Sequence, residues 1–245
     1  MEVHAHSHTE RKKFTHYLWE FLMMFLAVFC GFIAENLRER NVETHRAKQY
    51  IASIAEDLKT DIHSLDSIAQ GRQQRGILLD SLFSLLNDPD SDQRGADIYF
   101  YARGLTYYFQ FVNNDRTISQ LKNSGNFRLI HDTQISDRLM DYDRQLRWIA
   151  PTNAREELMI EKYIDELPDL FDSRVFNEMM DKKFGFHKPS GNPRLFAVDP
   201  YKLQRFMTTI HFLKAINIFI NTWQERQKTR AEGILDYIQK EYHLE

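Results

Sequence analysis

The sequence predicts an all-α protein, in which an N-terminal transmembrane helix continues into a long stalk helix and an antiparallel helical bundle. Apolar residues recur at helical spacing over most of the chain, and strand-like alternation is scarce. Only six Pro and nine Gly interrupt the 245 residues. We expect three parts: a flexible tail at residues 1–16, a transmembrane anchor at 17–37, and a helical stalk and bundle domain at 38–245.

The tail contains an alternating histidine motif, HAHSH, with His4, His6 and His8. Alternating imidazoles could chelate a divalent metal, but a short terminal segment fixes no coordination geometry. A solvated tail is the simpler interpretation, so we expect no metal site here.

The anchor is predicted from residues 21–34, which contain no charged side chain. A helix of these residues alone is about 21 Å long, too short for a hydrocarbon core of about 30 Å, but extension to residues 17–37 gives about 31 Å. A helix packed in a soluble domain usually keeps a polar stripe, and this one has none. The side chains that we expect to meet lipid are Tyr17, Trp19, Phe21, Leu22, Phe25, Leu26, Phe29, Phe32 and Ile33.

The apolar run could also belong to a cleaved signal peptide. Cleavage needs small residues, yet Phe32 occupies one of the required positions in Phe32-Ile33-Ala34. We therefore expect an uncleaved single-pass signal anchor. Basic residues flank it on both sides almost equally, but the compact cluster at residues 11–13 favours a tail inside and a domain outside.

The stalk is predicted from residues 38–69, which contain no Pro or Gly. A heptad-like seam alternates spacings of four and three along Ile51, Ala55, Leu58, Ile62, Leu65 and Ala69. The seam could meet a second copy of the chain or later helices of the same chain, and we favour the latter. Gly71 and Gly76 allow a break, after which we expect a short helix and then the polar loop NDPDSDQRG.

Residues 96–112 hold seven aromatic side chains. Such a stripe could wall a pocket for a flat or apolar ligand, with tyrosine hydroxyls orienting it. Core packing is the commoner explanation. We retain Tyr101, Tyr107 and Tyr108 as candidate binding residues.

A pair of helices is predicted in the centre of the chain. Asp115 is a typical N-cap, and Gly125 is typical of a left-handed helix terminus. The next helix should start near Asp132 or Thr133 and end at Pro151.

Four polar residues surround the junction of these two helices and could bind an anion at the helix start. These candidate binding residues are Asn123, Asn126, Arg128 and His131. Local capping explains most of them equally well.

Three segments resemble an uncharacterised family of Bacteroidota proteins, each with one N-terminal membrane helix and a helical domain. These are WEFLMMFLAVFCGFIAEN, EDLKTD at the end of the stalk, and TISQLKNSGNFRLIHDTQISDRLMDYD. The similarity covers roughly residues 14–66 and 115–146. The resemblance implies a bacterial envelope setting and carries no known activity. Together with the orientation predicted from the basic cluster, this setting places the anchor in the inner membrane and the domain in the periplasm.

The final third should contain a helix to Leu167 that Pro168 interrupts, and a long loop over residues 184–200. Asp199 before Pro200 predicts the start of a helix that reaches Tyr242. Its apolar face comprises Leu203, Phe206, Ile210, Leu213, Ile216, Ile220 and Trp223. Polar residues interrupt this helix, so we do not expect a second span.

Catalytic motifs are missing from the sequence. It contains no HExxH, GxSxG, phosphate loop or dinucleotide fingerprint, and no Glu-x-x-His pair of a di-iron bundle. The only cysteine, Cys30, excludes an intramolecular disulfide and a thiolate cluster. Asp57, Asp61 and His63 share part of the stalk surface with Glu56 and could hold a metal, but a solvated or salt-bridged face explains them better. We expect no catalysis and no cofactor.

Two functional classes remain open. The first is an envelope interaction or scaffold protein that uses helical surfaces to bind a protein partner or a second copy, in addition to the lipid bilayer. The second is a sensory or small-ligand-binding bundle that signals through a partner subunit. The net charge of -3 comes from interspersed charges without a basic block, which argues against nucleic acid as a partner.

Overall fold

The computed structural model describes residues 14–181, 185–196 and 199–243, and within these ranges the chain is helical and contains no strand. One isolated antiparallel β-bridge joins Met180 and Phe186. The helices are α1 (Phe14–Leu86), η1 (Ser91–Gln93), α2 (Gly95–Gly104), α3 (Arg116–Ser124), η2 (Asn126–Leu129), α4 (Thr133–Glu166), η3 (Leu167–Asp169), α5 (Ser173–Glu178) and α6 (Pro200–Tyr242). The all-α class and the long apolar N-terminal helix are thereby confirmed. The predicted histidine motif and the basic cluster at residues 11–13 lie outside the described residues.

The chain divides into two units, Met1–Tyr50 and Ile51–Glu245. The described part of the first unit is residues 14–50 of α1. This helix is long and apolar enough to cross a membrane, and its apolar segment is not buried against any part of the chain that the structure describes.

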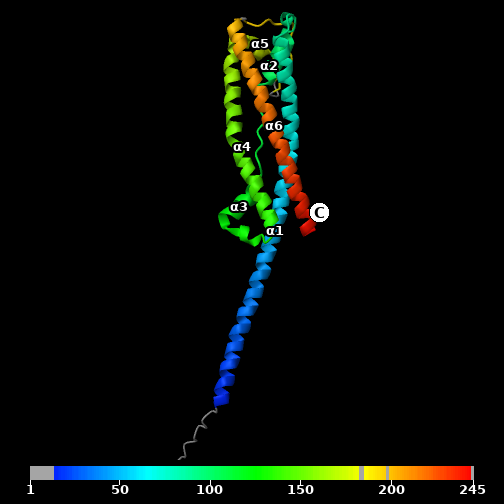
Figure 1. The fold of residues 1–245 in the computed structure, drawn as a ribbon. Helices are drawn as coiled ribbons and strands as arrows, with labels where there is room; N and C mark the ends of the chain where they lie inside the picture. The colour runs from blue at the N-terminus through cyan, green and yellow to red at the C-terminus, as the bar shows by residue number, and fades with distance from the viewer. Residues whose placement is uncertain (1–13, 182–184, 197–198, 244–245) are drawn as a thin grey trace, which may run out of the picture. The chain divides into compact units, whose positions relative to one another are not determined.

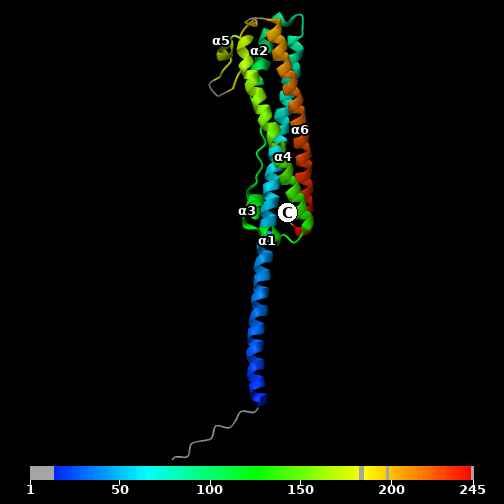
Figure 2. The ribbon, with the colours of Figure 1, turned by 60° about the vertical axis from the view of Figure 1, so that its left-hand side comes forward.

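The second unit is built on residues 51–86 of α1 together with α4 and α6, which lie side by side (Figures 1 and 2). Two contacts show that α1 and α4 run in the same direction. The Tyr142 hydroxyl donates a hydrogen bond to Asp61, and farther along both helices Arg72 forms an ion pair with Glu156.

Helix α6 runs in the opposite direction. Lys214, early in α6, forms an ion pair with Asp80, whereas Lys228 forms one with the earlier Asp66 of α1. The apolar seam at Ile51, Leu58 and Leu65 is fully buried within the single chain, so the interpretation of this seam as an intramolecular contact is confirmed.

A linking segment, residues 106–115, connects α2 to α3 without forming a helix. Helices α2 and α3 lie at opposite ends of the second unit, and the linking segment follows the long helices between them (Figure 1). Because it has no helical hydrogen bonds of its own, its backbone groups need partners from the neighbouring helices.

The main apolar core lies at the α2 and α5 end of this unit. It combines the last turns of α1, the C-terminal part of α4 and the first turns of α6. Its fully buried members include Leu79, Leu82, Ile98, Tyr99, Ala102, Leu105, Tyr163, Leu170, Met179, Phe206 and Leu213.

Two predicted helix boundaries are wrong. Helix α1 passes through Gly71 and Gly76 without a break, and α4 passes through Pro151 to Glu166. A Cβ at Gly71 would lie 2.5 Å from Cε1 of Phe109, so this glycine allows the linking segment to approach closely. An interior proline costs about 3 kcal/mol, which the packing of α4 along the rest of its length outweighs.

Other boundaries are confirmed. Asp132 caps α4 by accepting hydrogen bonds from the backbone of Gln134 and Ile135, and Asp199 caps α6 in the same way. Gly125 ends α3 with φ at 68°, in the left-handed region. Asp115 occupies the N-cap position of α3, although its side chain bonds to Ser119 and not to the backbone.

Candidate functional site

The predicted anchor side chains lie on one uninterrupted helix and are all solvent-accessible. Their exposed fractions run from 37% for Leu22 to 65% for Phe21 and Phe32. The rings of Phe21, Phe25 and Phe29 stack along one ridge, with centroids 6.4 and 5.9 Å apart. Apolar side chains around the whole circumference of a helix are expected where a protein core or lipid surrounds it, and no described part of this chain covers the apolar segment.

A first polar cluster forms where the linking segment meets α3. The carboxylate of Asp57 accepts hydrogen bonds from Asn114 Nδ2 at 2.9 Å, from the Arg116 guanidinium at 2.8 Å and from the Thr117 backbone amide at 3.1 Å. Asp61 accepts from the backbone amide of Asn114 at 2.7 Å. Both carboxylates therefore satisfy polar groups of the linking segment and of the first turn of α3.

Asp57 and Asp61 are both buried, so the interpretation of this face as solvated is wrong for these two residues. The salt-bridged alternative holds for Asp57, which forms an ion pair with Arg116 at 2.8 Å. Burial raises the pKa of Asp61, while hydrogen bonds from Asn114 and Tyr142 oppose that rise. His63 is exposed and Glu56 pairs with Lys59 on the surface, so the stalk residues do not converge. No group of three or more metal-binding side chains occurs in the described part of the chain.

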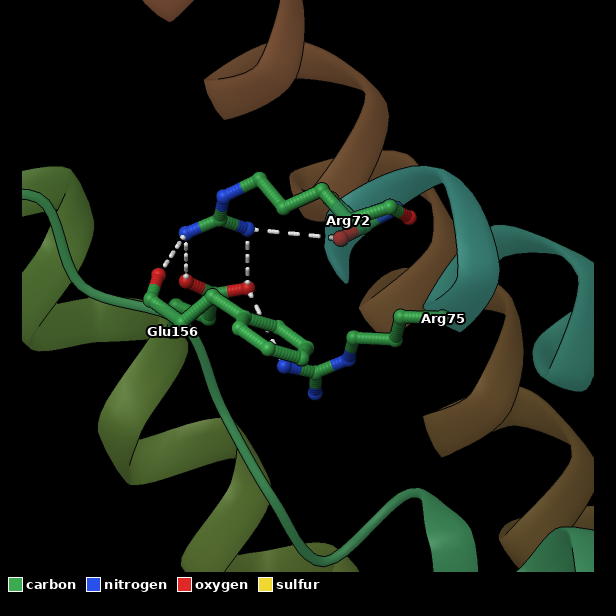
Figure 3. A network of polar contacts seen from close by, with 5 residues as sticks. Arg72, Arg75 and Glu156 are labelled. Carbon is green, nitrogen blue, oxygen red and sulfur yellow. Dashed lines mark hydrogen bonds and ion pairs between the residues drawn. The ribbon is translucent and has the colours of Figure 1, made fainter. Parts of the chain in front are cut away.

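A second polar cluster comprises Arg72, Arg75 and Glu156 (Figure 3). The Arg72 guanidinium donates to both oxygens of Glu156, at 2.9 and 2.8 Å. It also donates to the backbone carbonyl of Phe109 at 2.6 Å and to Oδ1 of Asn217 at 3.3 Å. This cluster joins α1, α4, α6 and the linking segment.

The two arginines differ in their partners. Arg75 lies 3.5 Å from Oε1 of Glu156, an oxygen that already accepts a hydrogen bond from Arg72. Burial lowers the pKa of Arg75, and the neighbouring Arg72 lowers it further, while Glu156 acts in the opposite direction.

The sequence carries a signal for this cluster, which the helix end expected at Gly71 obscures. Residues 51, 58, 65, 72, 79 and 86 are seven apart, and all are apolar except Arg72. Extending the heptad seam across the expected break at Gly71 would have placed Arg72 inside the protein. The same argument places Glu156 between the buried Ile149 and Tyr163 of α4.

The aromatic candidates separate into buried and exposed groups. Tyr101 is partly buried and packs against the apolar core, whereas Tyr107 and Tyr108 are 45% and 42% exposed. Tyr107 stacks on Phe186, and the Tyr108 hydroxyl reaches Glu157 at 3.4 Å. These tyrosines thus have separate local contacts.

The polar candidates Asn123, Asn126, Arg128 and His131 lie at α3, η2 and the start of α4. The structure does not bring them together with the tyrosine at α2, because α2 and α3 occupy opposite ends of the second unit (Figures 1 and 2). At the start of α4 the Asp132 carboxylate already binds the backbone amides. An anion there would compete with a carboxylate that the chain itself supplies.

The described surface of the second unit has several open grooves, and two of them lie along α4. One, of about 370 Å³, lies between the end of α4 and α5. The other, of about 320 Å³, lies between the middle of α4 and α6. No protein-family model, curated protein or solved structure matches the chain.

Proposed function

We propose that the chain is a membrane-anchored helical interaction or scaffold protein of the bacterial cell envelope, without catalytic activity. The observation that carries the proposal is the helix over residues 17–37, whose apolar side chains are not covered by any other described residues. At about -0.3 to -0.6 kcal/mol for each large apolar side chain, insertion of this segment into a bilayer is favourable by roughly 2 to 5 kcal/mol. In this proposal α1 crosses the membrane once and enters a bundle in which α4 runs parallel to it and α6 runs antiparallel to it.

Fractionation of cells tests the anchor. We expect the full chain to stay in the membrane pellet after alkaline carbonate washing, and a truncated chain starting at Glu43 to be soluble and helical. Phe25→Arg with Phe29→Arg should release the full chain, because each central arginine costs about 2.5 to 3.5 kcal/mol. The matched control, Thr44→Arg with Gln49→Arg, changes exposed positions outside the segment and should stay in the pellet. A wild-type chain in the supernatant would contradict the anchor.

We further propose that the tail is cytoplasmic and that residues 38–245 are periplasmic, in the inner membrane. The proposal rests on the basic cluster before the first apolar helix. Protease added to intact spheroplasts should digest the domain. A domain that survives until the cells are lysed would show the reverse orientation.

The interaction role is supported by large apolar side chains on the α4–α6 face. Trp148, Phe212 and Phe219 are about half exposed, and the rings of Trp148 and Phe219 lie 6.3 Å apart beside the groove between these helices. Contiguous exposed apolar side chains on a folded domain commonly mark interaction surfaces. We propose that a protein partner or a second copy binds through these helices.

A pull-down from detergent-solubilised membranes tests this role. We expect a partner in stoichiometric amount, and at least tenfold less of it with Trp148→Ser plus Phe219→Ser. Val112→Ser plus Tyr201→Ser, which changes two side chains that are both 75% exposed elsewhere, serves as the control and should retain the partner. If both double variants recovered equal amounts of the partner, the partner would not bind the α4–α6 face.

A ligand-binding or sensory bundle that signals through a partner subunit is the second candidate. It is favoured by the groove of about 370 Å³ at α5, which is lined largely by apolar side chains such as Phe171, Phe176 and Phe196. Native mass spectrometry of the purified chain would distinguish the two candidates. A co-purifying small molecule that Phe176→Asp removes would favour this role over the scaffold.

A further inference from the structure

The second polar cluster contains a buried positive charge that is not balanced. The Arg72 and Arg75 side chains are each 1% exposed, and the Glu156 side chain is 2% exposed. Two guanidinium groups therefore share one carboxylate. A buried charge without a counter-charge is far more costly than a buried hydrogen-bonded pair.

Arg75 is the arginine of this cluster that lacks a hydrogen-bond acceptor. None of its three side-chain nitrogens has a hydrogen-bond acceptor among the described residues, and its contact with Glu156 is an ion pair at 3.5 Å without a hydrogen bond. Both oxygens of Glu156 are already bound by Arg72. Buried polar groups in folded proteins are nearly always hydrogen-bonded, so three such donors on one charged group require an explanation.

The neighbouring side chains do not supply the missing acceptor. The hydroxyl of Tyr163 donates its hydrogen to the backbone carbonyl of Ala102. The Oδ1 atom of Asn217 accepts from Arg72, and its Nδ2 donates to the Arg72 carbonyl. Neither of these two side chains therefore accepts a hydrogen bond from Arg75.

We propose that a small monovalent anion of the size of chloride binds the Arg75 guanidinium and completes the charge balance of the cluster. A single negative charge matches the excess of one positive charge. A monatomic ion can accept hydrogen bonds from several guanidinium nitrogens at once. The Arg75 side chain is 1% exposed among the long helices, and this burial favours the smallest anions.

The linking segment provides the route to this site. It covers the cluster through Phe109, whose carbonyl binds Arg72 and whose ring lies against Gly71. This segment lies outside any helix, and Phe109 is partly exposed. Local displacement of the segment would give an ion access without unfolding α1, α4 or α6.

The melting temperature of the full chain in detergent micelles tests the proposal. Sodium chloride replaces sodium gluconate at constant ionic strength, and unfolding is followed by circular dichroism. Wild type should melt roughly 3 to 6 °C higher for each tenfold rise in chloride above its dissociation constant. Arg75→Met, which removes the charge but keeps much of the volume, should show no chloride dependence.

The matched control is Arg144→Met, at an arginine that is 70% exposed on α4 and pairs with Asp141. It should respond to chloride as wild type does. A chloride response of the same size in wild type and Arg75→Met, or no response in wild type, would overturn the proposal.

Bromide supplies a second measurement that needs no variant. In crystals grown with sodium bromide, an anomalous peak should lie within hydrogen-bonding distance of the Arg75 nitrogens. A well-ordered Arg75 without such a peak would overturn the proposal even if Arg75→Met failed to fold.

Discussion

The two ends of the second unit differ in the polarity of their buried side chains. Where α2 and α5 pack on the long helices, the interior is mostly apolar, with Leu79, Leu82 and Phe206 fully buried, and the buried Glu166 at its edge pairs with Arg205. Toward α3, the interior contains Asp61 and Arg72 among the apolar residues. The linking segment, residues 106–115, follows the helices through this polar part.

The difference shows what determines where charged residues are buried in this fold. A helix satisfies its own backbone hydrogen bonds, so helices can meet through apolar faces. The linking segment does not, and Arg72 and Asp61 of α1 bind its Phe109 carbonyl and Asn114 amide. Arg72 and Asp61 thus supply hydrogen-bond partners that the backbone of a helix would find within the helix itself.

The largest expected effect on stability comes from replacing Glu156, in the part of the second unit that lies toward α3. Glu156→Gln would leave two buried guanidinium groups without a carboxylate and should cost about 3 to 5 kcal/mol of unfolding free energy, measured by urea denaturation. The control is Glu161→Gln, an exposed position on the same helix that should change stability by less than about 0.5 kcal/mol. Hydrogen exchange should also increase in the linking segment. Unchanged exchange there would contradict the role assigned to the cluster.

A cavity in the apolar core near α2 and α5 should lower the unfolding free energy nearly as much, but should increase hydrogen exchange in a different region. Leu82→Ala should lower the unfolding free energy by about 2 to 5 kcal/mol. Ile77→Ala, at a side chain that is 57% exposed on the same helix, should have a much smaller effect. Hydrogen exchange in Leu82→Ala should increase around α2 and α5 first. If exchange in the linking segment increased equally, the two ends would not be distinct.

Substitution by alanine should lower the unfolding free energy at one helical glycine and raise it at another. At Gly71 the new Cβ would meet the Phe109 ring, so Gly71→Ala should cost about 1 to 3 kcal/mol. A Cβ at Gly233 of α6 would meet nothing within 4 Å, so Gly233→Ala should stabilise the protein by up to about 1 kcal/mol. Thermal melting of both variants checks the pair. Stabilisation by Gly71→Ala would show that the linking segment is not held against α1.

The smallest expected effect is the pH dependence at Asp61. Its pKa is raised by burial, so the folded state binds a proton more readily than the unfolded state, and this contribution to stability is lost as pH rises through the raised pKa. As pH falls from 7 toward about 4, wild type should therefore gain unfolding free energy relative to Asp61→Asn. Denaturant melts at several pH values measure this difference. A relative gain on raising the pH would reverse the assigned sign.

The sequence by itself determined the features that depend on neighbours along the chain. The charge-free run over residues 21–34 specifies an apolar helix, and the αL glycine at Gly125 and the Asp-Pro pair at Asp199 mark helix ends. The apolar face of α6 follows from its period. These signals are local, because capping and helical periodicity act within one or two turns.

Only the tertiary structure decided which glycines and prolines lie inside helices and which charged residues are buried. Gly71 and Pro151 carry the local signals of helix ends, yet both lie inside helices because the packing partners lie far away in the sequence. Arg72 and Glu156 are 84 residues apart, and their burial depends on the path of the linking segment between α1 and α4. Burial and pairing of a charge are properties of what lies opposite it, which local sequence does not encode.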